Sequence, residues 1–169
     1  VYRKRYVKGS VVNLPGTAYN VSKYHVIVRP VTNIQPAYDL KPITSYRTNV
    51  AVISEGVKKE IVATREAAVV RSNEIATLEW PIQVGVADMY SVTVKYFYPL
   101  DKKLVGKIQL IGAGNSMMAE EPVNFTFTRP GKWNQLTIHT PGMINAGNYM
   151  VRLVITGAEG LAISGIELQ

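Results

Sequence analysis

Apolar and polar residues alternate with a period of two through the last third of the chain, and this pattern constrains the fold more than any other feature of the sequence. Residues 133–138, 145–155 and 161–168 all show it, and turn residues such as Pro141-Gly142 and the segment 157–160 separate them. A period of two is typical of half-buried strands in an antiparallel sheet, whereas an amphipathic helix repeats every 3.6 residues. The pattern predicts an all-β chain that ends on strands, and it favours a β-sandwich over an α/β fold.

The same alternation continues upstream, at regular spacing, as far as residue 50. In the segment 89–98, tyrosine and valine side chains fall on one face and serine, threonine and lysine side chains on the other. Burying such a face stabilises the fold by about 1.5–3 kcal/mol for each large apolar side chain. We expect at most a single helical turn, at residues 116–121. The strands that we expect are 50–54, 60–64, 67–71, 76–84, 89–98, 105–111, 123–128, 136–140, 148–155 and 161–168.

The first 49 residues differ from the rest of the chain in charge. Residues 1–50 hold eight basic residues and one acidic residue, which accounts for the whole net charge of +7. The segments 2–12 and 19–29, joined by a turn at Pro15-Gly16, predict a basic β-hairpin, and the prolines between residues 30 and 42 predict an extended connection. We therefore expect residues 1–49 to be an N-terminal extension, either part of the sandwich or the end of a preceding domain, and residues 50–169 to be the β-sandwich.

Several classes of function lack the residues that they need. The chain has no cysteine, so disulfides, thiolate metal sites and cysteine nucleophiles are excluded. No segment reaches the roughly 18 uninterrupted apolar residues of a membrane span. His25 and His139 lie in strand-like segments without a nucleophile motif, and Glu79, Asp88 and Glu167 are scattered acids and not an evident catalytic pair. We expect no catalytic residue in this chain and interpret it as a non-enzyme.

Specific segments carry a resemblance to a known group of modules. They are Trp80-Pro81-Ile82-Gln83-Val84 followed by residues 87–96, the strand beginning at Trp133, the G-x-Y-x-V-R-L strand 147–153, and the closing L-x-I-x-x-I-x-L strand 161–168. Together they resemble galactose-binding-like jelly rolls, especially carbohydrate-binding modules of families 6 and 35 and malectin-like modules. The resemblance spans roughly residues 50 to 169.

The resemblance implies a function and a setting. Such modules are appended to bacterial glycoside hydrolases, including β-galactosidase-like enzymes. By this resemblance the chain would be a noncatalytic carbohydrate-binding or accessory module at the C-terminal end of a larger glycoside hydrolase, periplasmic or extracellular. Its partners would be an oligo- or polysaccharide and the neighbouring catalytic domain. The alternative is a structural β-sandwich spacer without a ligand.

A sugar site needs an aromatic ring as a platform and amide or carboxylate groups for the hydroxyls. We expect the site at Trp80, Tyr98 and Trp133, with Asn115 and Asn134 as polar partners. Burial of all three rings would favour the spacer, because the binding hypothesis would lose its platform. Further candidates near strand ends are Phe97, Gln135 and Asn145.

The resembled modules often hold a structural calcium between an early glutamate and an acidic residue of the final strand. Glu66 is the candidate for the early glutamate. The final strand reads Ile163-Ser164-Gly165-Ile166 where an aspartate is usual, and calcium needs six to eight hard oxygen ligands. We therefore expect no calcium and no other cofactor.

Nucleic-acid binding is a third hypothesis, because Arg3-Lys4-Arg5 lies between Tyr2 and Tyr6. Cations neutralise phosphates and rings stack on bases. On a strand, however, Lys4 would lie on the face opposite to Arg3 and Arg5, which leaves a small patch. Edge strands also carry positive charge to prevent edge-to-edge pairing, and we favour this explanation.

Overall fold

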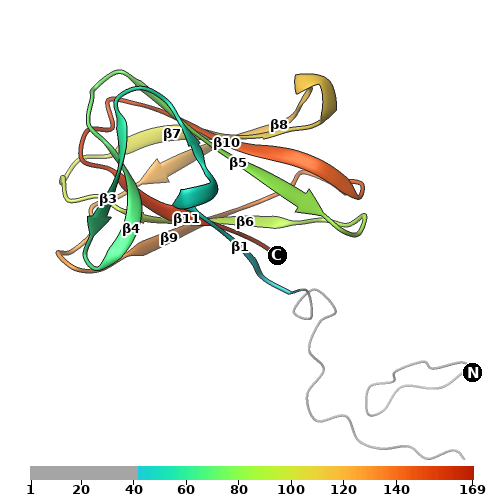
Figure 1. The fold of residues 1–169 in the computed structure, drawn as a ribbon, viewed down its shortest axis with the longest axis horizontal. Helices are drawn as coiled ribbons and strands as arrows, with labels where there is room; N and C mark the ends of the chain where they lie inside the picture. Colours follow the sequence, from blue (N-terminus) through green and yellow to red (C-terminus); the bar gives the residue numbers. More distant parts are fainter. Residues whose placement is uncertain (1–41) are drawn as a thin grey trace, which may run out of the picture. The chain divides into compact units, whose positions relative to one another are not determined.

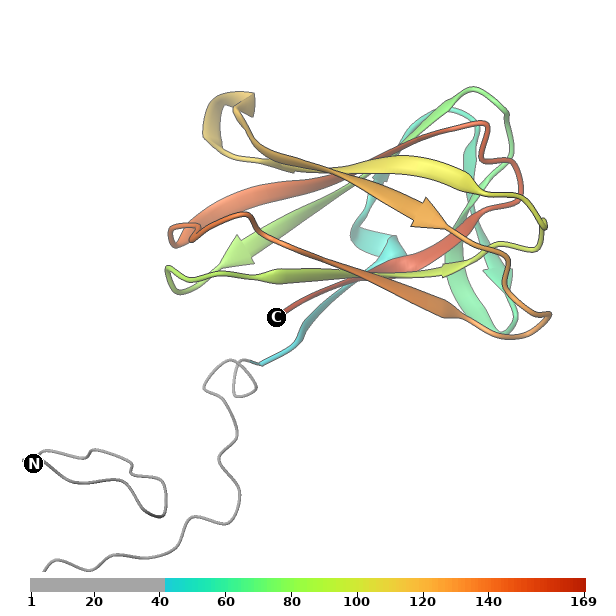
Figure 2. The same cartoon turned by 180° about the vertical axis from the view of Figure 1, so that it is seen from behind.

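Two antiparallel sheets lie face to face in the part of the chain that the structure, a computed structural model, describes, residues 42–169 (Figures 1 and 2). The strands of the first sheet are β1 (Thr44–Arg47), β3 (Val57–Val62), β4 (Arg65–Val70), β6 (Ser91–Phe97), β9 (Asn134–His139) and β11 (Ala162–Leu168). Those of the second sheet are β2 (Val52–Ile53), β5 (Ile75–Val84), β7 (Leu104–Ile111), β8 (Met117–Phe125) and β10 (Gly147–Thr156).

The order of the first sheet is β3-β4-β11-β6-β9, with β1 also paired to β11, and that of the second is β2-β5-β10-β7-β8. The expected antiparallel β-sandwich is confirmed. The expected hairpin at residues 2–29 and the connection up to residue 41 lie outside the described residues.

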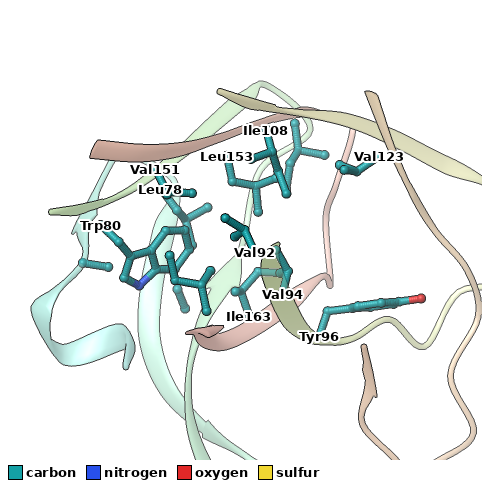
Figure 3. Packing of buried hydrophobic residues seen from close by; sticks show 14 of the residues in the cluster. Leu78, Trp80, Val92, Val94, Tyr96, Ile108, Val123, Val151, Leu153 and Ile163 are labelled. Atoms are coloured by element: carbon teal, nitrogen blue, oxygen red, sulfur yellow. The ribbon is translucent and has the colours of Figure 1, made fainter. Parts of the chain in front are cut away.

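The core forms where the inner faces of the two sheets meet. The period-two pattern places Leu78 and Trp80 of β5, Val94 of β6 and Leu153 of β10 in this layer, and all four are fully buried (Figure 3). The rings of Tyr96 and Phe125 pack edge to face, with ring centroids 5.0 Å apart and planes at 87°. Apolar burial on this scale supplies most of the stabilisation of a sandwich without disulfides.

Strand β11 pairs with different strands along its two halves. Ala162 and Ile163 pair with β4, whereas the segment 165–168 pairs with β1. A β-bulge separates the halves, since the register with β6 shifts between Ile163 and Gly165. At this break Thr48 Oγ1 donates a buried hydrogen bond of 2.9 Å to the carbonyl of Ile163.

The sandwich therefore includes residues 44–47, ahead of the boundary expected at residue 50. Strand β1 has no buried residue and follows no apolar period, so its sequence contains no strand signal. Its backbone pairing with β11 makes it a strand. Because residues 1–41 lie outside the described part, the division of the chain at residue 49 stays a prediction.

The single helical turn expected at residues 116–121 is wrong, because these residues begin strand β8. Backbone pairing with β7 extends along β8 from Met117 to Phe125 and overrides the weak local preference. In residues 42–169 the helical segments are two short 3-10 turns, η3 (Thr48–Val50) and η4 (Ala113–Asn115), and no helix there is long and apolar enough to span a membrane.

The described unit begins and ends at the same end of the sandwich. Gln169 exchanges backbone hydrogen bonds with Ser91, where β6 begins, and Thr44 pairs with Leu168. The opposite end of β6 pairs with Asn134, at the start of β9. Gln169 therefore lies at the end of β6 opposite to Trp133. The β3–β4 hairpin also lies away from the C-terminus (Figures 1 and 2).

We predict that Gly165→Ala destabilises the sandwich by about 2–3 kcal/mol. Gly165 has φ +147°, and a Cβ atom there would lie 2.5 Å from the carbonyl oxygen of Tyr46 on β1. Gly142 is the matched control, because a Cβ atom there meets nothing within 4 Å. Urea unfolding measures both variants. Equal midpoints for Gly165→Ala and Gly142→Ala would contradict the role of the bulge.

Candidate functional site

Two of the three aromatic rings expected to contact sugar belong to the core. Trp80 and Tyr98 both have 0% of their surface exposed. Trp80 falls in the inward register of β5, and Tyr98 continues the inward positions of Val94 and Tyr96 beyond the end of β6. The prediction that Trp80 and Tyr98 form a sugar platform is therefore wrong, because neither ring has a face in contact with solvent.

Trp133 differs from these two rings, because it lies on the outer face of the first sheet and is half-buried. It directly precedes β9, and its ring lies 6.1 Å from that of Phe97, centroid to centroid, at an angle of 50°. The indole Nε1 is on the buried side of the ring. We call this group, together with Arg65, the Trp133 platform; its other members are Val62, Ala67, Val69 and Ala162.

A strained hairpin turn brings Arg65 to the platform. Val62 pairs with Arg65 across a two-residue turn in which Ala63 and Thr64 both have positive φ, 44° and 69°. Glycine and asparagine are the usual residues for such a turn, and a β-branched threonine is strained there. The guanidinium carbon of Arg65 lies 5.7 Å from the centroid of the Trp133 ring, a cation–π distance.

The carboxylates on this face are already paired with cations. Glu60 binds Arg71, whose Nε donates to Glu60 Oε1 at 3.0 Å, and this hydrogen bond lowers the pKa of Glu60. Glu167 binds Lys95. Among residues 42–169, no carboxylate forms an ion pair with Arg65. The Arg65 guanidinium, the charged group of the platform, therefore has no ion-pair partner among the described residues.

A band of polar side chains continues along the outer face from the platform. Thr93 and Thr137 share a hydrogen bond of 2.8 Å between their hydroxyls, and Gln135 lies opposite Lys95. Glu167 also accepts a hydrogen bond of 3.2 Å from Ser45 Oγ. We call this group the polar band; its members are Ser45, Thr93, Lys95, Gln135, Thr137 and Glu167.

The expected amide partners do not join Trp133. Asn134 lies opposite Tyr96, whose ring is in the core, and residues opposite each other share a face. Its side chain therefore projects to the other side of the sheet, whereas the next residue, Gln135, shares the face of Trp133. Asn115 lies in η4, after the end of β7 and so at the opposite end of the sandwich. Of the five residues that the sequence assigned to the site, the structure places only Trp133 on this surface.

The scattered acids do not form a catalytic pair. Glu79 lies on the outer face of the second sheet, where its Oε1 is 2.5 Å from Arg152 Nε, whereas Glu167 lies on the outer face of the first sheet. Glycoside hydrolysis requires two carboxyl groups that face each other across the substrate. A depression between edge strands β8 and β9, bordered by Glu121 and His139, has a volume of about 20 Å³, which holds roughly one water molecule. It is too small for a sugar.

Calcium has no evident ligand set in the described part. Glu66 is exposed beside the β3–β4 turn, and the Ser164 hydroxyl lies 3.5 Å from the carbonyl of Lys95. No group of three or more acidic or histidine side chains in residues 42–169 is arranged to hold a metal ion. The expectation of no calcium stays a prediction.

Solved structures share this fold. A family 35 carbohydrate-binding module from Clostridium thermocellum has a TM-score of 0.65 and 15% identity, over 76% of this chain and 98% of that one. The C-terminal family 6 module of a marine laminarinase from Zobellia galactanivorans has a TM-score of 0.58 and 17% identity, over 76% of this chain and 99% of that one. The resemblance to modules of families 6 and 35 is thus confirmed for the fold.

One structural neighbour is much longer than this chain. The isomalto-dextranase of Arthrobacter globiformis, solved in complex with panose, matches with a TM-score of 0.62 and 15% identity over 75% of this chain, but over only 23% of its own length. No family model and no curated protein matches the sequence.

We predict that Tyr98→Phe stabilises the protein by about 1 kcal/mol, because the buried Tyr98 hydroxyl has no hydrogen-bond partner among the described residues. Burial also raises the pKa of the Tyr98 phenol above its usual value of about 10. A raised native pKa means that stability is full below pH 10 and declines above it. Unfolding from pH 8 to 11 should therefore show a weaker alkaline loss for the variant. A variant less stable than the parent at every pH would contradict this account.

We also predict that replacing Ala63-Thr64 by Asn-Gly stabilises the protein by about 1 kcal/mol, because these residues adopt positive φ with less strain. Thermal unfolding measures the gain. The control is the same replacement with the order reversed, Gly-Asn, which fits this turn less well. A loss of stability for Asn-Gly would show that the turn is not strained.

Proposed function

We propose that this chain is a noncatalytic carbohydrate-binding module whose glycan packs on the Trp133 platform. The observation that carries the proposal is the half-buried indole of Trp133 on the outer face, beside the polar band, on a fold shared with carbohydrate-binding modules. The part of the indole that solvent reaches suits the apolar C–H face of a pyranose. The hydroxyls and charged groups of the polar band suit the fringe of sugar hydroxyls.

The platform is open, so affinity for a single sugar would be low. At roughly 0.3 kcal/mol per ligand atom, a ring of about a dozen atoms gives about 3.6 kcal/mol, which corresponds to millimolar binding. Contacts with several sugars, or tethering to an enzyme, would raise the effective affinity. We therefore place the module, as an accessory, in a larger secreted glycoside hydrolase, periplasmic or extracellular, at its C-terminal end. The isomalto-dextranase neighbour, of whose length the match covers 23%, supports a module within a larger enzyme.

The second candidate function is a structural spacer without a ligand. Burial of Trp80 and Tyr98 favours it, because two of the three expected rings are structural. Trp133, which is only partly buried, favours binding. Nucleic-acid binding depends on the basic segment at residues 2–6, which lies outside the described residues.

We predict that Trp133→Ala abolishes glycan binding, whereas Trp133→Phe, which keeps a smaller ring, weakens it several-fold. A panel of plant and bacterial polysaccharides is tested by affinity electrophoresis, and binding is confirmed by acrylamide quenching. Since Trp80 is buried, quenching reports mainly on Trp133, and a bound glycan should protect it. The matched control is Phe127→Ala, an aromatic side chain that is 43% exposed and outside the platform.

The spacer hypothesis makes the opposite prediction. No glycan of the panel would bind, and none would change the quenching of Trp133. Binding that survives Trp133→Ala but is lost in Phe127→Ala would move the site away from the platform.

A further inference from the structure

Four of the five methionines of the chain are exposed at one end of the sandwich. The side chains of Met89, Met117, Met118 and Met143 have 53%, 56%, 51% and 71% of their surface exposed. They come from the loop after β5, the start of β8 and the loop before β10 (Figure 1). We call these four side chains the methionine tip. The fifth methionine, Met150, is half-buried in β10.

Backbone pairing brings the three segments of the methionine tip together. Asp88 and Ile144 exchange backbone hydrogen bonds of 3.1 and 2.9 Å, so the loop after β5 runs antiparallel to the loop before β10. Met89 and Met143 are the next opposite positions in this antiparallel register. Strand β10 pairs with the end of β7, which pairs in turn with the start of β8. The four thioethers therefore belong to one end of the sandwich.

The hydrogen bonds that fix the two paired loops do not involve sulfur. The Tyr90 hydroxyl donates to the carbonyl of Val86 at 2.7 Å. The Tyr149 hydroxyl donates to the carbonyl of Asn145 at 3.0 Å. No methionine is among the buried core residues of the part of the chain that the structure describes. Oxidation of the tip sulfurs therefore leaves these hydrogen bonds and the core in place.

Exposed thioethers are the groups of this chain that a two-electron oxidant attacks most readily. The chain has no cysteine, whose thiolate would otherwise compete for the oxidant. A sulfur lone pair attacks one oxygen of hydrogen peroxide, the O–O bond breaks, an S–O bond forms, and the other oxygen leaves as water. The sulfur loses two electrons and the peroxide gains them. With hypochlorous acid, the same oxygen transfer releases chloride and a proton.

We infer that the methionine tip is an oxidation site, which consumes peroxide or hypochlorous acid before these oxidants attack the indole of Trp133. Each thioether takes up one oxygen atom and becomes a polar sulfoxide, a change that methionine sulfoxide reductases reverse. Trp133 precedes β9, whereas the loop that carries Met143 follows the other end of β9. A sulfoxide at the tip therefore does not alter the Trp133 platform, and the inference holds whether or not the platform binds a sugar.

The first experiment uses the unaltered full chain and needs no variant. The protein is treated with hydrogen peroxide, and peptide mapping by mass spectrometry follows the sulfoxide at each methionine over time. The four tip methionines should react as fast as methionine in a short unstructured peptide, and Met150 should react several-fold more slowly, because susceptibility follows exposure. The urea midpoint and the acrylamide quenching of Trp133 should not change. Equal rates at Met150 and at the tip, or a lower urea midpoint after oxidation, would overturn the inference.

The second experiment tests whether the tip spares the indole. The tip variant combines Met89→Leu, Met117→Leu, Met118→Leu and Met143→Leu, and the matched control is Met150→Leu. Each protein receives one equivalent of hypochlorous acid for each methionine of the tip. The parent and the control should keep their tryptophan fluorescence, while the tip variant, shown to be folded by its urea midpoint, should lose several-fold more. The same loss in all three proteins would refute a protective role.

Discussion

The bulge in β11 is the constraint on which the first sheet depends. One edge of β11 must pair with β4 along its first half and with β1 along its second half. A regular strand cannot change partner without leaving backbone groups unpaired, and unpaired buried groups are costly. The extra residue at Ser164 and the missing side chain at Gly165 make the change possible, and Thr48 occupies the carbonyl that the break exposes.

The first half of β11 also supports the aromatic surface. Ala162 lies between Val69 of β4 and Phe97 of β6, and it is 1% exposed. A small side chain there, together with Ala67, leaves room for the indole of Trp133 to pack with its Nε1 edge inward. A larger residue at position 162 would lift the ring off the sheet. The position of Trp133 thus depends on small residues of two central strands, and on the bulge that fixes where β11 faces β4.

Period-two alternation predicted the strands that bury one face, among them β5, β6, β10 and β11. It missed β1, which has no buried residue, and the first half of β8, which is largely exposed and is held by backbone pairing with β7 and by the ion pair between Lys107 and Glu120. The burial of Trp80 was present in the pattern, since it shares its period with Leu78 and Ile82. The same rule separates Asn134 from Trp133. No local pattern joins Arg65 to Trp133, because β4 and β9 are separated in the sheet by β11 and β6, and only tertiary packing brings the two side chains together.

The described unit begins and ends at the same end of the sandwich, and the Trp133 platform lies toward the other end. Gln169 lies where β6 begins, and Trp133 lies where β6 ends. A strand of seven residues spans about 23 Å at roughly 3.3 Å per residue. Gln169 is therefore separated from the indole by about the length of that strand. A fluorophore or a solid support joined at residue 169 begins at the far end of β6 from Trp133, so the junction itself does not cover the aromatic surface.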